Sequence, residues 1–135
     1  MTYIRPCKGG ERGYLYYNAP SAGLDPHGNT VRATITVPAG KKMRIDNVVI
    51  GMNITQAASS AGDRQFTLYR DNGTDIISIS RNFIRRNKNT VGDELLIAIQ
   101  PLVICDAGDI VYLRSTDAST GGKTGFYGVV WYTLL

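Results

Sequence analysis

Histidine is almost missing from this sequence of 135 residues, in which His27 is the only one. A metal-dependent cupin typically needs several histidines and a carboxylate converging on one ion, and a single histidine cannot supply that set. Catalytic arrangements of the Ser-His-Asp and Cys-His kinds would both have to use this same residue, and no Gly-x-Ser-x-Gly motif is present. His27 lies in a turn-forming segment, so we interpret it as an exposed loop residue. The scarcity of histidine predicts a protein that is not an enzyme and that holds no metal and no cofactor.

Acidic residues are few as well, at 11. A glycosidase needs only two carboxylates across a cleft, so a carbohydrate-active enzyme remains the least favoured alternative. Aspartate is common in turns because its side chain bonds the nearby backbone, and most of the aspartates here stand in turn-like segments. They are Asp25, Asp63, Asp71, Asp106, Asp109 and Asp117. We interpret these residues as turn formers.

Long apolar runs and cysteines are also scarce. No run of about 18 apolar residues occurs that could cross a membrane, and the first residues lack the apolar stretch of a signal peptide. We therefore expect synthesis in the cytosol and no membrane partner. Cys7 and Cys105 are the only cysteines and stand at unrelated positions, which favours reduced thiols over a disulfide.

What the sequence does contain is alternation of apolar and polar residues, with the period of two that is typical of strands. The segment 33–51, ATITVPAGKKMRIDNVVIG, is predicted to form a strand, a tight turn and a second strand that together make one ladder. Pro38 has no N–H to donate and Gly40 can take a positive φ, so this pair ends the first strand. The apolar positions change phase after Asp46-Asn47, which predicts a β-bulge. The residues expected on the dry face of the first strand are Val31, Ala33, Ile35 and Val37.

Turn signals divide the rest of the chain into further short strands. Asn72-Gly73 between two alternating runs predicts a hairpin with a type I′ turn. The polar and basic segment 81–94 is predicted to loop across one end of the sheets. The segment 126–135, FYGVVWYTLL, is apolar on both faces, which predicts a central strand or one covered by another subunit. We predict an all-β, antiparallel jelly-roll or β-sandwich fold of about eight strands.

Two segments are candidates for binding a partner. Residues 1–29 are predicted to form an extended N-terminal arm with one short strand at 14–17, and residues 30–135 a single jelly-roll domain. The arm is rich in tyrosine, which suits protein interfaces, and the segment 81–88 is rich in arginine. A solvated loop is the ordinary interpretation of such a basic run, and with few aromatics interleaved it does not favour a nucleic acid. The candidate partner-binding residues are Tyr3, Tyr14, Tyr16, Tyr17, Arg81, Arg85, Arg86 and Lys88.

Trp131 is the only tryptophan. Because its sequence neighbours are apolar, a place in the core or in an interface is favoured over a platform for stacking a sugar.

In two stretches, ITVPAGKKMRIDNVVIG (35–51) and VICDAGDIVYLR (103–114), the chain resembles small jelly-roll structural proteins of tailed bacteriophages. Strand-VPAGK-strand and AGD-x-V hairpins recur in that group. The size and the lack of catalytic residues look most like a head decoration, or cement, protein. The shared motifs build a fold and not a site, so the resemblance transfers no functional residue.

The resemblance implies a viral structural protein, made in the host cytoplasm and located on the capsid surface of the virion. Such a protein stabilises the phage head by clamping neighbouring subunits of the major capsid protein, often as a homotrimer. A tail or fibre-associated jelly roll that binds a host glycan is the main alternative, which the tyrosines would permit. A homo-oligomer is expected in addition because a monomer could hide only part of the two-faced apolar strand at 126–135.

Overall fold

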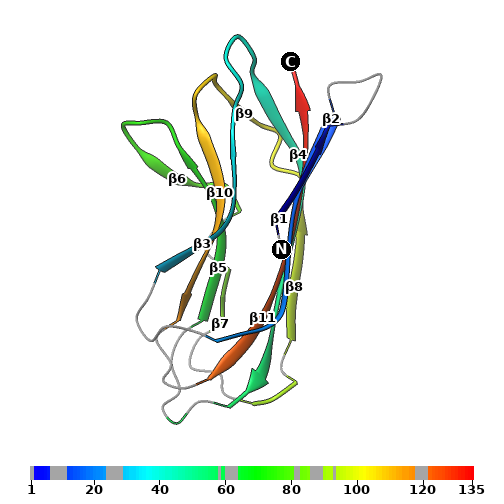
Figure 1. The fold of residues 1–135 in the computed structure, drawn as a ribbon, viewed down its shortest axis with the longest axis vertical. Helices are drawn as coiled ribbons and strands as arrows, with labels where there is room; N and C mark the ends of the chain where they lie inside the picture. Colours follow the sequence, from blue (N-terminus) through cyan, green and yellow to red (C-terminus); the bar gives the residue numbers. More distant parts are fainter. Residues whose placement is uncertain are drawn as a thin grey trace.

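The computed structural model of the chain describes residues 2–6, 12–23, 29–57, 59, 64–80, 83–85, 90–92, 94–117 and 122–135. These residues form eleven strands and no helix. The strands are β1 (Thr2–Pro6), β2 (Arg12–Gly23), β3 (Asn29–Thr36), β4 (Met43–Gln56), β5 (Arg64–Asp71), β6 (Ile76–Ser78), β7 (Phe83–Arg85), β8 (Glu94–Ile99), β9 (Val103–Cys105), β10 (Ile110–Asp117) and β11 (Lys123–Leu134). They make two antiparallel sheets that face each other as the layers of a sandwich (Figure 1), which confirms the predicted fold class.

The order of the strands identifies the sandwich as a jelly roll. One sheet runs β1-β2-β11-β4-β8, with β9 also on β4, and the other runs β3-β10-β5-β6, with β7 also on β5. β8 and β9 lie along β4 as one interrupted strand, and β6 and β7 lie along β5 in the same way. If β8 with β9 and β6 with β7 are each counted as one strand and β1 is left out, eight strands remain. Numbered from one to eight along the chain, they stand in the order one, eight, three, six in the first sheet and two, seven, four, five in the second. This alternation between layers is that of two Greek keys.

The predicted ladder at 33–51 is wrong in its pairing, although both strands exist. β3 pairs with β10 in one sheet, and β4 pairs with β11 in the other. Each strand has one apolar face, and placing the two strands in opposite layers lets those faces pack against each other across the core. The turn between them has the predicted form, because Lys41 N–H donates to the Pro38 carbonyl at 3.2 Å and Gly40 has φ of +73°.

Of the irregularities in strand register, two decide which side chains of β3 and of the first half of β4 face the core. On β4, Trp131 of β11 pairs with Asn47 and Tyr132 pairs with Ile45, so Asp46 is the extra residue and the predicted bulge is confirmed. A second bulge, which the sequence pattern did not reveal, lies at Arg32 on β3. It reverses the alternation, so Val31 is 55% exposed instead of lying on the dry face.

The hairpin predicted at Asn72-Gly73 is confirmed, but its turn is not type I′. β5 and β6 pair antiparallel across a four-residue connection, and only Gly73 has a positive φ, at +87°. The Asn72 side chain instead accepts hydrogen bonds from the N–H groups of Thr74 and Asp75, at 2.9 and 2.7 Å. Asparagine acts here by bonding its own turn and not by adopting the left-handed conformation.

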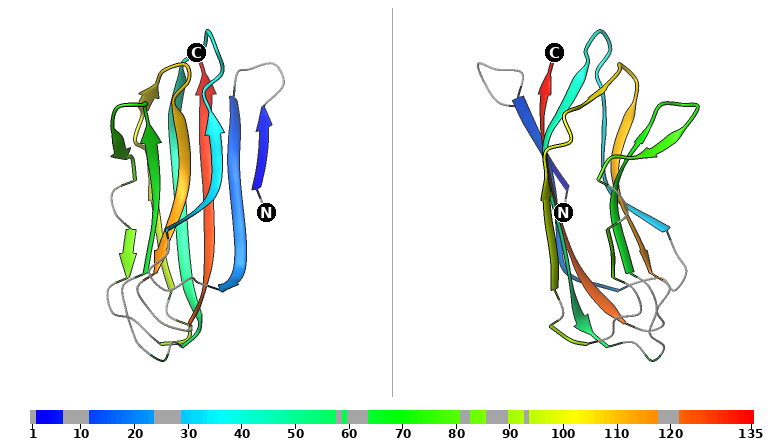
Figure 2. Two further views of the ribbon diagram at one scale, coloured as in Figure 1. Left: turned by 60° about the vertical axis from the view of Figure 1, so that its left-hand side comes forward. Right: turned by 180° about the vertical axis from the view of Figure 1, so that it is seen from behind.

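The N-terminal segment contains more strand than the sequence predicts. β2 extends well beyond 14–17 and pairs with β11, and its Leu15 side chain is fully buried in the core. β1 pairs with β2 and lies at one outer edge of the six-stranded sheet (Figure 2). Whether residues 1–29 behave as a separate arm stays a prediction.

The predicted loop at 81–94 also contains short strand pieces. Residues 83–85 form β7, which pairs with β5, and β8 begins at Glu94. β6 pairs only with the end of β5, at residues 69–71, and β7 pairs with its beginning, at residues 64–66. β7 therefore supplies hydrogen-bond partners to backbone groups of β5 that β6 does not reach. Positions 81–82, 86–89 and 93 lie outside the described residues.

The core fills the space between the two layers. Phe66 and Leu113 of the five-stranded sheet and Phe126 and Val130 of β11 are buried there, and the Phe66 and Phe126 rings lie 5.0 Å apart. Cys105 is a free, buried thiol, and burial raises its pKa to about 11. Cys7 and His27 lie outside the described residues.

Candidate functional site: the outer face of the six-stranded sheet

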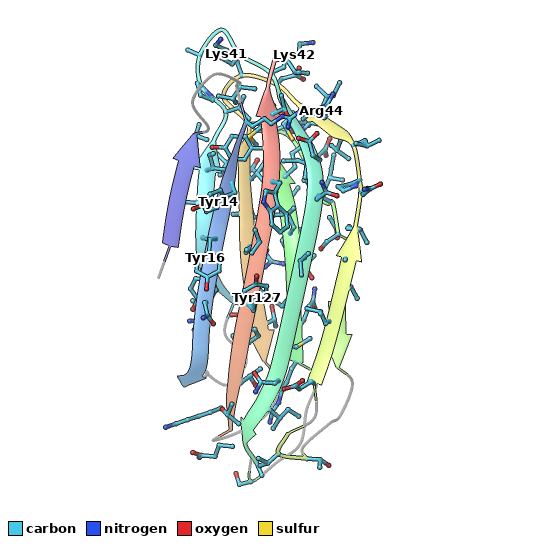
Figure 3. The ribbon with its side chains drawn as sticks, turned by 90° about the vertical axis from the view of Figure 1, so that its right-hand side faces the viewer. Tyr14, Tyr16, Lys41, Lys42, Arg44 and Tyr127 are labelled. Carbon is cyan, nitrogen blue, oxygen red and sulfur yellow. The ribbon has the colours of Figure 1, made fainter. Side chains whose placement is uncertain are left out.

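The face of the six-stranded sheet that points away from the core carries three rows of side chains. Alternation along β11 sends Phe126 and Val130 inward and leaves Tyr127, Val129 and Trp131 on the outer side. Figure 3 shows Tyr14, Tyr16 and Tyr127 on this face. The residues in register with these three complete the rows. The rows are Tyr14–Trp131–Asn47, Tyr16–Val129–Val49–Ala98 and Asn18–Tyr127–Gly51–Leu96. We call this surface the outer aromatic face.

Large apolar and aromatic groups reach solvent on this face. Trp131 is 40% exposed, Tyr127 37% and Leu96 66%. Tyr16 packs edge to face against Tyr127, with ring centroids 5.8 Å apart. A single exposed apolar residue needs no explanation, but several on one sheet face indicate a surface that binds something.

The corresponding face of the five-stranded sheet differs, because its aromatic rings are covered. Tyr69 and Tyr112 stack with centroids 5.6 Å apart, and each is only 8% exposed. The guanidinium of Arg114 lies over the Tyr69 ring at 4.3 Å. Those tyrosines stabilise the sheet, whereas those of the outer aromatic face are partly available to a partner.

A hollow of about 550 Å³, with charged and polar groups in part of its wall, opens beside Trp131. Its wall includes Arg12 of β2 and Arg44 and Asp46 of β4, together with Thr133 of β11. The Asp46 carboxylate is held on both oxygens, since Arg44 Nε donates to Oδ1 at 2.5 Å and Thr133 Oγ1 donates to Oδ2 at 2.6 Å. Burial acts to raise the pKa of Asp46, but these hydrogen bonds and the nearby arginine charges outweigh it and hold the pKa below its usual value.

A second, smaller hollow of about 210 Å³ lies toward the other end of the same face. It is lined by Asn18, Gly51 and Asn53 with Glu94, Leu96 and Tyr127. Gly51 stands between Tyr127 and Leu96 in the third row, and its missing side chain contributes the depression. A third hollow, of about 460 Å³, is lined by Asn47, Val49 and Ala98 of the same face, so the outer aromatic face is uneven.

The structure brings together only some of the residues proposed for partner binding. Tyr14 and Tyr16 lie half-buried on the outer aromatic face, whereas Tyr17 is buried and packs against Phe66 in the core. Tyr3 is in β1 and Arg85 in β7, with the backbone alone described. The other three, Arg81, Arg86 and Lys88, lie outside the described residues.

Three basic residues, Lys41, Lys42 and Arg44, follow the β3–β4 turn (Figure 3), and the last two form ion pairs. Lys42 lies 3.7 Å from the Asp106 carboxylate, and Arg44 is bonded to Asp46. Such pairs at the surface contribute little to binding on their own. This group therefore does not form a free cationic patch.

The sequence did not identify the hollow beside Trp131. The sequence favours the core or an interface for Trp131; the residue is 40% exposed, so it does not lie in the core, and a place in an interface stays a prediction. Its cross-strand neighbours Tyr14 and Asn47 are distant in sequence. The bulge at Asp46 was the only local signal, and it did not reveal that Arg44 and Thr133 would hold the carboxylate. Pairing between β2, β11 and β4 creates the site.

Among the described residues no group of three or more histidine, cysteine, aspartate or glutamate side chains is arranged to hold a metal ion. The described part of the chain also contains no helix long and apolar enough to span a membrane.

No protein-family model matches the chain, and no curated protein sequence matches it significantly. Solved structures to which the chain is similar include an arabinose-bound α-L-arabinofuranosidase, with 12% identity, a TM-score of 0.44 and coverage of 97% of this chain and 22% of that one. A tumour necrosis factor, Eiger from S. frugiperda, has 10% identity, a TM-score of 0.48 and coverage of 99% and 91%. Infectious bursal disease virus, Gx strain, gives 15% identity, a TM-score of 0.44 and coverage of 98% and 31%. These similarities carry no argument about function.

Proposed function

We propose that this protein is a decoration protein of a tailed bacteriophage, which binds the major capsid protein on the virion surface and stabilises the head. It acts without catalysis, as a homo-oligomer for which a trimer is favoured. The jelly roll serves as a rigid body, and the residues that clamp the shell lie along its N-terminal edge. The resemblance of segments 35–51 and 103–114 to phage jelly-roll proteins supports this assignment.

The observation that carries the proposal is the position of β1. This strand is added outside the eight strands of the jelly roll and pairs on one side with β2. In an antiparallel edge strand, alternate N–H and C=O groups point away from the sheet, where a strand from a neighbouring molecule can pair with them. An edge of this kind binds an extended segment of a capsid subunit while the jelly roll itself stays unchanged.

The test is to delete residues 2–6 and measure retention on purified virions. Deleting as far as residue 17 would remove Leu15 and Tyr17 from the core and would unfold the domain, so the shorter deletion is the informative one. We expect the truncated protein to keep a cooperative melting transition and to dissociate from virions that retain the parent protein. Virions stripped of the protein should lose integrity at a lower temperature.

A matched control replaces Ile76 and Ile77 with serine. Both side chains are exposed on the hairpin of the other sheet, at 57% and 47%. Retention of this variant should equal that of the parent. If the folded deletion variant stays bound as tightly as the parent, the N-terminal edge is not the clamp. If the parent itself does not bind virions, the decoration function is wrong.

A further inference from the structure

We infer that the hollow beside Trp131 binds an acidic sugar, that is, a glycan unit that carries a carboxylate. The sugar ring lies against the indole, its hydroxyl groups bond to Asp46 and Asn47, and its carboxylate binds Arg12. The hollow adjoins β1, because Gly13 in its wall pairs with Pro6, but the sugar does not use the outer, unpaired edge of that strand, and the inference goes beyond a role in holding a capsid together.

The indole provides a rigid apolar platform. Trp131 lies in the central strand β11, with Tyr14 of β2 and Asn47 of β4 in register on either side. Pairing on both edges fixes its backbone, and 40% of the residue remains exposed. The negative face of an aromatic ring attracts the weakly positive C–H groups on the apolar side of a sugar ring. A ring fixed before binding loses little entropy when the ligand arrives.

The polar rim is ordered before a ligand arrives. Asp46 is held by Arg44 and Thr133, and its side chain is 21% exposed, so the carboxylate keeps contact with the hollow. An ionised carboxylate accepts about four hydrogen bonds, and two of these positions are used by the partners named here. The remaining positions can accept from sugar hydroxyls. Asn47, which also lines the hollow, offers one acceptor and two donors beside the indole.

The charge of the hollow favours an anion. Its titratable groups are Arg12, Arg44 and Asp46, with Tyr132 also in the wall. Asp46 is ion-paired with Arg44, so these two charges offset each other, and the positive charge of Arg12 remains. Arg12 is exposed, and a guanidinium can bind a carboxylate through two parallel hydrogen bonds. Arg12 also acts on Asp46 electrostatically, but two arginines face one aspartate here, so the hollow keeps a net positive charge that a ligand carboxylate would balance and a neutral sugar would not.

The size of the hollow agrees with a small ligand. A volume of about 550 Å³ lies within the range of roughly 300–1,000 Å³ that is typical of small-molecule sites. The combination of one exposed ring and several hydrogen-bonding groups suits a polyhydroxylated ring with one apolar side. An apolar protein surface would remove water from the Asn47 amide and from the remaining acceptor positions of Asp46 without supplying hydrogen bonds in return.

Trp131 also provides the readout, because it is the only tryptophan in the chain and its fluorescence reports on this hollow alone. Purified full-length protein is titrated with glucuronic acid and with N-acetylneuraminic acid, and glucose and acetate serve as comparisons. We expect a saturable change in fluorescence with at least one acidic sugar, at an affinity about tenfold higher than for glucose or acetate. Added salt should reduce the advantage over glucose, because it screens the charge of Arg12.

Variants separate the two parts of the site. Arg12→Gln should bring the affinity for the acidic sugar down to that for glucose. Lys123→Gln, at an exposed cation at the other end of β11, should leave the affinity unchanged. Trp131→Ala should abolish binding in calorimetry, and its melting temperature shows whether it folds. No saturable change with either acidic sugar would overturn the inference, as would equal binding of acetate or an Arg12→Gln variant that binds like the parent.

Discussion

At the residue scale, Asp46 links the architecture to the candidate site. It is the inserted residue of the β4 bulge, and its carboxylate is held by Arg44 and by Thr133 of the neighbouring strand. A regular β4 would alternate past this point and place a different side chain in the hollow. The bulge therefore determines both the register of β4 with β11 and which side chain stands at the rim of the hollow.

Asp46 should also make stability depend on pH. Its pKa is lower in the folded protein than its usual value of 3.8, so its contribution is fully present above that value and is lost as pH falls through the folded pKa. We expect Asp46→Asn to lower the free energy of unfolding by about 1 kcal/mol at pH 7. Denaturant titrations of the parent and the variant should converge as the pH drops below about 4. A constant difference down to pH 2 would show that the ionised carboxylate does not stabilise the fold.

Gly128 is a second residue with a measurable role. A Cβ at this position would lie 2.6 Å from Leu113 Cδ1 and 3.4 Å from Phe66 Cε2. Because these side chains are packed in the core, we expect Gly128→Ala to lower the free energy of unfolding by about 1–3 kcal/mol. Lys123→Ala on the exposed side of the same strand is the control and should stay within about 0.5 kcal/mol of the parent. A neutral Gly128→Ala would mean that Leu113 can move aside.

At the element scale, most strands could be predicted from the sequence but their partners could not. Alternation located β3 and β4, Asn72-Gly73 located the β5–β6 hairpin, and the apolar segment 126–135 located β11. Pairing is decided by contacts between distant residues, so β3 and β4 entered different sheets without any local signal. The hollow beside Trp131 depends on the same long-range pairing, which is why the sequence did not predict it.

The break between β8 and β9 contains a strained residue. Leu102 has φ of +50°, the only positive φ outside glycine among the described residues, and its side chain is 62% exposed. Asparagine tolerates this conformation better than leucine, so Leu102→Asn should raise the free energy of unfolding by about 0.5–1 kcal/mol. The comparison is Leu96→Asn, at an equally exposed leucine within β8, which should bring no gain. Equal effects of the two substitutions would show that backbone conformation is not the cause.

At the scale of the whole molecule, self-association should use the sheet edge formed by β8 and β9. Leu96 and Ile104 are exposed there, at 66% and 48%. Replacing both with lysine should shift the protein from oligomer to monomer in sedimentation experiments at micromolar concentration. The free energy needed to bury the lysine charges in the interface is larger than the free energy that the remaining apolar contacts contribute. The same double replacement at Ile76 and Ile77, on the other sheet, should leave the oligomer intact. A monomeric parent protein would contradict this prediction.

The central place of β11 has a further consequence, which concerns the time at which the fold can form. β11 lies between β2 and β4 and pairs with both, yet it is made about seventy residues after β4 during synthesis. Until residues 123–134 leave the ribosome, β2 and β4 each keep an unpaired edge facing a gap in the sheet. Pairing between strands so far apart in sequence makes folding slow. Unpaired strand edges in partly folded chains favour aggregation. Yield in recombinant cells should therefore depend on how fast the last strand enters the gap, more than on the stability of the finished jelly roll.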